Sequence, residues 1–128
     1  MKKVTGFALM GIGLLHSLLA LLTPRFFGFS DIWQDIAAAG VVDAASPESL
    51  RIWGFYWLLM PGFLLILFGL LCDWIERQLE LPLPSFVGWG LLAIALFGIV
   101  LDIDTGFWLV LVAAINAIAA SRHTQQTV

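Results

Sequence analysis

The sequence predicts an all-α fold, namely an integral membrane four-helix bundle with a short interfacial helix between the first and second spans. Hydrophobic residues make up 61% of the 128 residues and charged residues only 12%, with a mean hydropathy of +0.99. This composition excludes an ordinary soluble domain. Four apolar stretches, separated by proline or polar residues, approach the length that crosses a bilayer. Together they are expected to form one domain, residues 1–128.

The first stretch, residues 4–22, contains no formal charge, and His16 is its only ionisable side chain. As a helix it extends about 28 Å, close to the roughly 30 Å hydrocarbon core of a bilayer. An arc of about 80° on this helix collects mostly small side chains. Its members are Gly6, Gly13, His16 and Ala20, with Leu9 as the one bulky side chain and Ser17 at the edge. Because small residues let helices approach closely in lipid, this arc and His16 should face protein.

Residues 25–49 form the longest polar segment and should contain a short second helix. Ser30 is its expected N-cap and Gly40 its expected stop. One face of this helix would carry Ile32, Trp33 and Ile36. The pattern predicts a helix that lies in the membrane interface, with the indole at headgroup depth.

The second span, residues 50–73, follows a strong helix-start signal at Ser46-Pro47-Glu48. The helix should continue to Arg77, which forms an exposed i,i+4 pair with Asp73. Pro61 lies in the middle of the span. A kink is expected there, because proline removes one hydrogen bond and its ring clashes with the carbonyl four residues earlier.

The third and fourth spans, residues 86–101 and 106–120, are joined by a short turn, and the polar tail 121–128 should fray. The expected buried stripe of the third span is Gly88, Leu91, Ala95, Gly98 and Asp102. The stripe of the fourth span is Thr105, Leu109, Ala113, Asn116 and Ala120. Both follow from the 100° rotation per helical residue.

The distribution of cations predicts a multi-pass protein of the plasma (bacterial inner) membrane with both termini in the cytoplasm. This topology puts Lys2, Lys3, Arg77 and Arg122 inside, and only Arg25 and Arg51 outside. A net charge of −3 with scattered cations excludes a basic surface that binds nucleic acid. Cys72 is the only cysteine, so it forms no internal disulfide and is expected to be a small apolar filler.

The sequence lacks the features of several enzyme classes, because it has no metal-ligand cluster, glycine-rich phosphate loop or Ser-His-acid arrangement. No metal and no cofactor is therefore predicted. In the expected topology the outer half could hold a cavity, with His16 and Asp102 as candidate catalytic, proton-transferring residues. The candidate ligand-binding residues are Tyr56, Trp53, Trp57, Met60, Asp104 and Arg51.

Each candidate also has a structural interpretation. His16 can be satisfied by a backbone carbonyl or by Asn116, and the two aspartates can be helix ends at the water interface. The tyrosine and tryptophans can form an interfacial aromatic belt.

Four segments together resemble a family of small bacterial four-span membrane proteins without an assigned function. They are G-x-G-x-x-H (Gly11 to His16), LLCDWIER (Leu70–Arg77), GWGLLA (Gly88–Ala93) and GFWL (Gly106–Leu109). The resemblance covers the whole chain and implies the architecture, without a mechanism. The chain is similar, more distantly, to emopamil-binding and sterol-isomerase-like membrane bundles. These place polar and acidic residues in a membrane cavity beneath a kinked helix, and His16 with the outer acids would fill that role.

Two functional hypotheses remain open. In the first, the protein binds a lipid-like or other hydrophobic small molecule in its outer half, with proton-transfer chemistry at His16. In the alternative, it is a non-catalytic accessory subunit whose small-residue stripes pack against another membrane protein. Membrane lipid is an expected partner in both cases, and either a homo-oligomer or a larger membrane complex is compatible with them.

Overall fold

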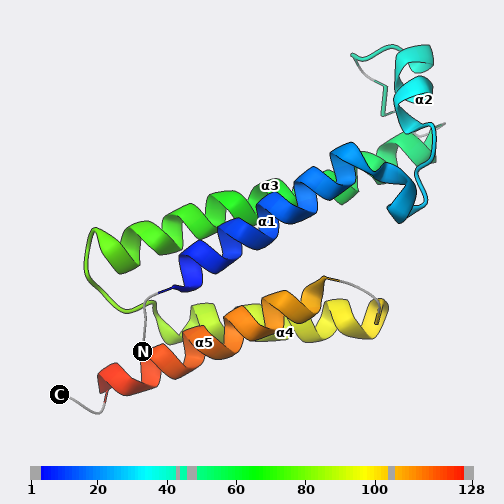
Figure 1. Cartoon of the computed structure of the whole chain (residues 1–128). Helices are drawn as coiled ribbons and strands as arrows, with labels where there is room; N and C mark the ends of the chain where they lie inside the picture. Colours follow the sequence, from blue (N-terminus) through cyan, green and yellow to red (C-terminus); the bar gives the residue numbers. More distant parts are fainter. Residues whose placement is uncertain (1–3, 43, 46–48, 104–105, 126–128) are drawn as a thin grey trace. The chain divides into compact units, whose positions relative to one another are not determined.

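The computed structural model describes residues 4–42, 44–45, 49–103 and 106–125, the last three of them as backbone only. The elements are α1 (Thr5–Leu22), the 3-10 helix η1 (Pro24–Phe27), α2 (Ile32–Ala39), α3 (Leu50–Arg77), α4 (Ser85–Leu101) and α5 (Phe107–Gln125) (Figure 1). The described residues contain no strand. The all-α prediction is therefore confirmed.

Most helix boundaries agree with the sequence. The helix α1 covers the first predicted span, and α3 runs without interruption through Pro61 to Arg77. The predicted pair on α3 is present, with 2.7 Å between Arg77 Nε and Asp73 Oδ1. The helix of the fourth predicted span, α5, is longer than predicted, because it continues to Gln125 instead of ending at residue 120. Ser121 explains part of this extension, since its side chain is buried and its hydroxyl donates to the carbonyl of Ile118 at 2.9 Å.

The start of α2 also differs from the prediction. Ser30 is not the N-cap: Asp31 is, with a positive φ of 60° and no side-chain capping bond. The unexpected turn η1 and the left-handed Gly28 (φ 80°) redirect the chain before α2. Gly40 follows the last helical residue as predicted, with φ 90°. The predicted start signal Ser46-Pro47-Glu48 lies outside the described residues.

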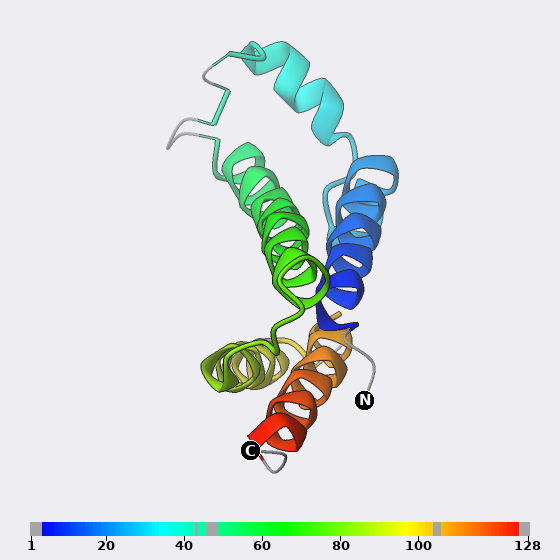
Figure 2. The ribbon, with the colours of Figure 1, turned by 90° about the vertical axis from the view of Figure 1, so that its left-hand side faces the viewer.

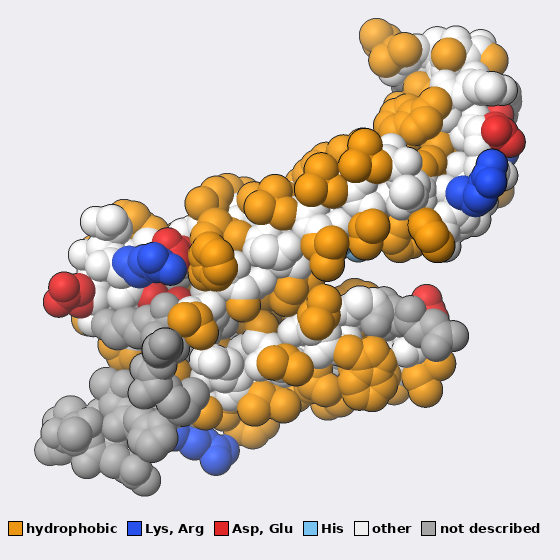
Figure 3. All heavy atoms as spheres, in the orientation of Figure 1, with side chains coloured by type: hydrophobic (Ala, Val, Ile, Leu, Met, Phe, Trp, Pro, Cys, Tyr) orange, Lys and Arg blue, Asp and Glu red, His pale blue; other side chains and the backbone are white. Residues whose placement is uncertain are grey.

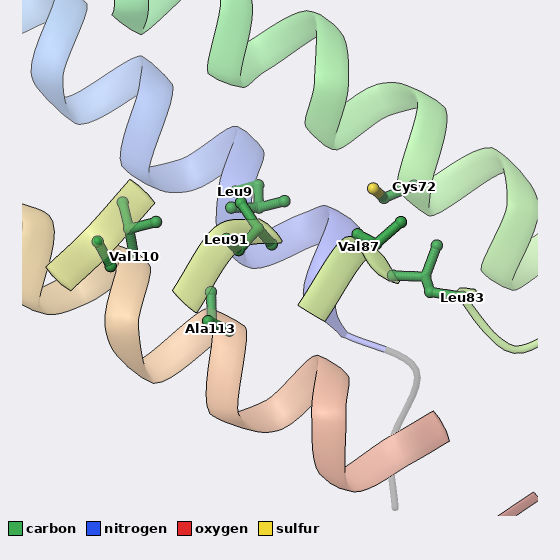
Figure 4. Packing of buried hydrophobic residues seen from close by; sticks show 9 residues of the cluster. Leu9, Cys72, Leu83, Val87, Leu91, Val110 and Ala113 are labelled. Atoms are coloured by element: carbon green, nitrogen blue, oxygen red, sulfur yellow. The ribbon is translucent and has the colours of Figure 1, made fainter. Parts of the chain in front are cut away.

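The chain divides into two compact units: a terminal unit (Met1–Ile12 and Leu65–Val128) and a central unit (Gly13–Leu64). In the terminal unit, α4 and α5 lie side by side (Figure 2). Its core, drawn in Figure 4, consists of Leu9, Cys72, Leu83, Val87, Leu91, Ala95, Val110, Ala113 and Ala114. The predicted stripe of α4 is confirmed from Gly88 to Gly98, whereas Asp102 is exposed. On α5 the prediction was wrong for Leu109, which is exposed while Val110 is buried.

The central unit has a core of its own. It consists of Ala20, Ile32, Ile36, Ala44, Ile52, Phe55 and Leu59. Ile32 and Ile36 thus form the buried face of α2, as their spacing predicted. The ring of Phe55 is the centre of this core, with ring centroids 5.5 Å from Phe29 and 5.4 Å from Trp33.

The two longest apolar helices bury little of their surface. Both α1 and α3 are long and apolar enough to cross a membrane, but only 33% and 28% of their most apolar windows are buried. The helix α4 and the part of α5 whose side chains are described, Phe107–Arg122, are apolar but shorter than the length required of a candidate span. Figure 3 shows hydrophobic side chains along much of the visible helix surface, with the charged side chains near helix ends. One exposed stripe of α3 consists of Trp53, Trp57, Met60, Leu64, Leu67 and Leu71.

Candidate functional site

The most informative polar contact of the central unit is made by His16. Its Nε2 lies 2.8 Å from the backbone carbonyl oxygen of Leu58 on α3. Because a carbonyl oxygen only accepts hydrogen bonds, Nε2 carries the proton and donates it to Leu58. Nδ1 is then the only ring nitrogen that can accept a proton, and it makes no hydrogen bond within the described part of the chain.

Leu58 lies three residues before Pro61 on α3. Because proline has no N–H, the carbonyl that it leaves without a helical donor is that of Trp57, the neighbour of Leu58. Of the two structural partners that the sequence left open for His16, the structure has the backbone carbonyl. Asn116 belongs to the terminal unit.

Gly62 lets α1 approach this turn of α3. A Cβ atom on Gly62 would lie 2.8 Å from His16 Cδ2 and even closer to the hydroxyl of Ser17. Ser17 is buried, and its hydroxyl has no hydrogen-bond partner among the described residues. Glycine is therefore required at position 62, because any larger side chain would displace the imidazole.

The other side of the imidazole faces an aromatic ring. The ring centroids of His16 and Phe27 lie 5.9 Å apart, with an angle of 59° between the ring planes. Phe27 ends the turn η1 and is itself exposed. His16 is half-buried as a result. Its Nε2 has a structural role, and its Nδ1 is the part of the ring that could perform chemistry.

The predicted aromatic residues of α3 fall into two groups. Trp53, Trp57 and Met60 are exposed on one stripe of the helix, and the two indole rings are 5.5 Å apart. Tyr56 is half-buried and packs against the core of the central unit. The stripe is therefore available to a lipid or a hydrophobic ligand, whereas Tyr56 also supports the core.

Arg51 has local partners. Its Nη1 is 2.7 Å from Asp35 Oδ2 in an exposed ion pair, and its Nη2 donates to the carbonyl of Ser30. Arg51 thus connects the start of α3 to the first turn of α2 and to Ser30, two residues before α2 begins. These contacts occupy two of its nitrogen atoms, so the predicted ligand contact would have to compete with them.

The predicted acids lie elsewhere in the chain. Asp102 belongs to the terminal unit, whereas His16 belongs to the central unit. Asp102 follows the last residue of α4, and its backbone N–H donates to the carbonyl of Gly98. This geometry matches the structural interpretation of Asp102 as a helix end. Proton transfer between His16 and Asp102 stays a prediction. Asp104 lies outside the described residues. The described residues contain no group of three or more His, Cys, Asp and Glu side chains placed to hold a metal ion.

The sequence analysis missed Glu76, which is the most deeply buried charged residue of the described chain, with 3% of its surface exposed. In the terminal unit, its Oε2 accepts the backbone N–H of Gly6 at 3.1 Å. Gly6 lies in the first turn of α1, where backbone N–H groups have no acceptor within the helix. A carboxylate there is also favoured by the helix dipole. Glu76 therefore caps α1.

A seven-residue spacing could have revealed this contact. Buried residues repeat every seven positions on both long helices, a spacing typical of helices that pack along a shared seam. They are Gly6, Gly13 and Ala20 on α1, and Phe55, Gly62, Gly69 and Glu76 on α3. Glu76 continues a series that the sequence analysis recognised only on α1.

Comparison with known proteins gives one family. The profile of a family of unknown function, DUF6463, matches residues 1–124. No curated protein matches the chain, and no solved structure does either.

Proposed function

The chain belongs to the family of unknown function DUF6463, and we propose that it is a multi-pass membrane protein that binds a lipid-like or other hydrophobic small molecule through its central unit. The observation that carries the proposal is the state of His16. One nitrogen is held by Leu58, and the other is left without a partner within the described chain, on a helix with no other ionisable side chain. A ligand that combines an apolar body with one polar group would match both features.

Membrane insertion is supported by the low burial of α1 and α3. A core helix of a soluble protein is mostly buried, whereas only 33% and 28% of the most apolar windows of α1 and α3 are buried. Contiguous apolar surface of this extent requires a lipid or protein environment. The predicted four spans would include α4, with 17 residues, and the apolar part of α5, Phe107–Arg122, which lie near the lower limit of length for crossing a bilayer and would be helped by local thinning of the membrane.

The cation count places both termini in the cytoplasm in this proposal, with the turn η1 and α2 on the opposite side. Labelling of single cysteines with an impermeant reagent, after replacement of Cys72, tests the orientation. A cysteine at position 34 on α2 should react from outside the cell and one at position 78 should not. The reverse pattern would overturn the orientation, and release of the protein by alkaline carbonate would overturn membrane insertion itself.

The ligand is proposed to place its polar group at Nδ1 of His16. The exposed stripe of Trp53, Trp57 and Met60 is proposed as a separate surface for the apolar part of a lipid, because it lies on the opposite face of α3 from Gly62, the residue beside His16. The distant similarity to sterol-isomerase-like bundles supports a ligand of the sterol or lipid class. When it carries no proton, Nδ1 would accept a hydrogen bond or a proton from that group. The ring of Phe27, with its centroid 5.9 Å from that of the imidazole, would be a neighbour of the ligand.

Ligand carry-over through detergent purification tests the proposal. His16→Gln keeps an N–H donor for Leu58 but removes the basic nitrogen. We expect it to lower the bound ligand, quantified by mass spectrometry of a solvent extract, about twofold to twelvefold, the effect of one hydrogen bond worth about 0.5–1.5 kcal/mol. Trp57→Ala should lower the amount of lipid that is carried over on the exposed stripe. Trp74→Ala, an equally exposed indole on the same helix but in the terminal unit, is the matched control.

Two results would contradict ligand binding. The first is a wild-type protein that carries no small molecule beyond bulk lipid. The second is an equal loss in the Trp57 and Trp74 variants, which would indicate loose detergent-like association.

The accessory-subunit alternative receives less support from the packing. It requires the small-residue stripes to be free for a partner, but Gly6 and Gly88, which belong to these stripes, already lie against other helices of this chain. The same is true of Gly62 and Gly69 on α3. A Cβ atom at Gly11 or Gly90 would meet nothing within 4 Å, so these two positions stay open. Stable co-purification with a larger complex would favour the alternative.

A further inference from the structure

Arg25 has an exposed guanidinium without a partner. Its side chain makes no ion pair or hydrogen bond within the described residues. The two arginines of α3 differ, since Arg51 pairs with Asp35 and Arg77 with Asp73. Among the described residues of the central unit, no acid compensates the charge of Arg25.

Hydrogen bonds hold Arg25 in a closed turn directly after α1. The hydroxyl of Thr23 donates to the carbonyl of Leu19 at 2.8 Å. The backbone N–H of Gly28 donates to the carbonyls of Arg25 and Pro24. Gly28 has φ 80°, a conformation that glycine adopts without strain. The position of the arginine relative to the end of α1 is therefore defined by the backbone.

The surroundings of Arg25 are apolar and exposed. Leu22 and Phe26, on either side of it in the sequence, expose 75% and 84% of their surface. A guanidinium between exposed apolar side chains, at the end of a helix long enough to cross a bilayer, has the chemistry of a lipid contact. The apolar side chains match acyl chains, and the planar guanidinium matches a phosphate, which it can bind through two parallel hydrogen bonds.

We propose that the Arg25 turn (Leu22–Gly28) binds the headgroup of an anionic phospholipid. An anionic headgroup is favoured over a zwitterionic one because Arg25 is uncompensated. Asp35 is already neutralised by Arg51, and Asp31, the other described acid of this unit, forms no ion pair with Arg25. The proposal rests on the membrane insertion proposed above. It concerns the headgroup region and is independent of any ligand at His16.

The test uses the full-length protein in neutral detergent, titrated with phosphatidylglycerol or phosphatidylcholine and followed by native mass spectrometry. Wild type should bind phosphatidylglycerol more tightly, and added salt should reduce the difference. Arg25→Gln should weaken phosphatidylglycerol binding about fivefold, the effect expected for one cation near an anionic surface, and leave phosphatidylcholine binding unchanged. Arg25→Lys, which keeps the charge, should stay within about twofold of wild type.

Arg122→Gln is the matched control, since it removes one exposed cation from the terminal unit. Equal binding of the two lipids by wild type would refute the proposal. So would an unchanged preference in Arg25→Gln, or a loss in Arg122→Gln as large as that in Arg25→Gln. Resistance to carbonate extraction separates the two proposals. A protein that carbonate releases refutes membrane insertion, whereas an inserted protein without lipid preference refutes only the Arg25 site.

Discussion

Gly69→Ala should lower the free energy of unfolding by about 1–3 kcal/mol, the usual effect of overpacking a close contact. In the terminal unit, a Cβ atom on Gly69 would lie 2.6 Å from the backbone nitrogen of Met10 and 2.9 Å from the carbonyl oxygen of Gly6. Backbone atoms cannot move away by a rotamer change. The two helices would therefore have to separate, and the contacts around Gly6 would weaken with them.

Gly11→Ala is the matched control for this prediction. It places the same extra methyl group on α1, where a Cβ atom would meet nothing within 4 Å. Alanine is a better helix former than glycine by about 0.5–1 kcal/mol, so stability should stay the same or rise slightly. Denaturation in mixed detergent micelles, followed by circular dichroism, measures both variants. Equal stability of the Gly69 and Gly11 variants would show that α1 and α3 do not pack closely at Gly69.

Glu76→Ala should have an effect of similar size. It leaves the N–H of Gly6 buried without its carboxylate acceptor, and an unsatisfied buried group costs about 1–3 kcal/mol. Glu76→Gln keeps an acceptor oxygen but loses the negative charge. A hydrogen bond to a charged acceptor is roughly twice as strong as one to a neutral acceptor, so the bond to Gly6 should weaken. The expected order of stability is therefore wild type, then Glu76→Gln, then Glu76→Ala.

The same denaturation assay measures this order, with Gln78→Ala as the control because Gln78 is exposed beyond the end of α3. If Glu76→Ala were as stable as wild type, Glu76 would not cap α1. A Glu76→Gln variant more stable than wild type would show that desolvation of the carboxylate outweighs its bond to Gly6.

The faces of the helices could largely be predicted from the sequence. The arc of Gly6, Leu9, Gly13 and Ala20 on α1 is buried as predicted, and so is the stripe from Gly88 to Gly98 on α4. Both predictions use only the rotation per residue and the size of the side chains. They work because a helical face is a local property of the chain.

The errors occurred where a contact distant in the sequence decides the outcome. Ser30 was predicted to be the N-cap of α2 but is not. Its backbone carbonyl instead accepts a hydrogen bond from the side chain of Arg51, 21 residues away. Leu109 is exposed although its spacing fitted the predicted stripe, because α4 packs against the neighbouring face of α5 that carries Val110. Neither contact can be read from helical periodicity.

The sequence by itself determined that the chain is apolar and helical, where most helices begin and end, and that His16 lies on a packed arc. The tertiary structure alone decided what the polar groups of that arc meet. It placed Nε2 of His16 on the carbonyl of Leu58 and the carboxylate of Glu76 on the N–H of Gly6. These partners lie 42 and 70 residues apart in the sequence. The physical reason is that each partner depends on how far one helix slides along another, and close contacts at Gly62 and Gly69 set that register.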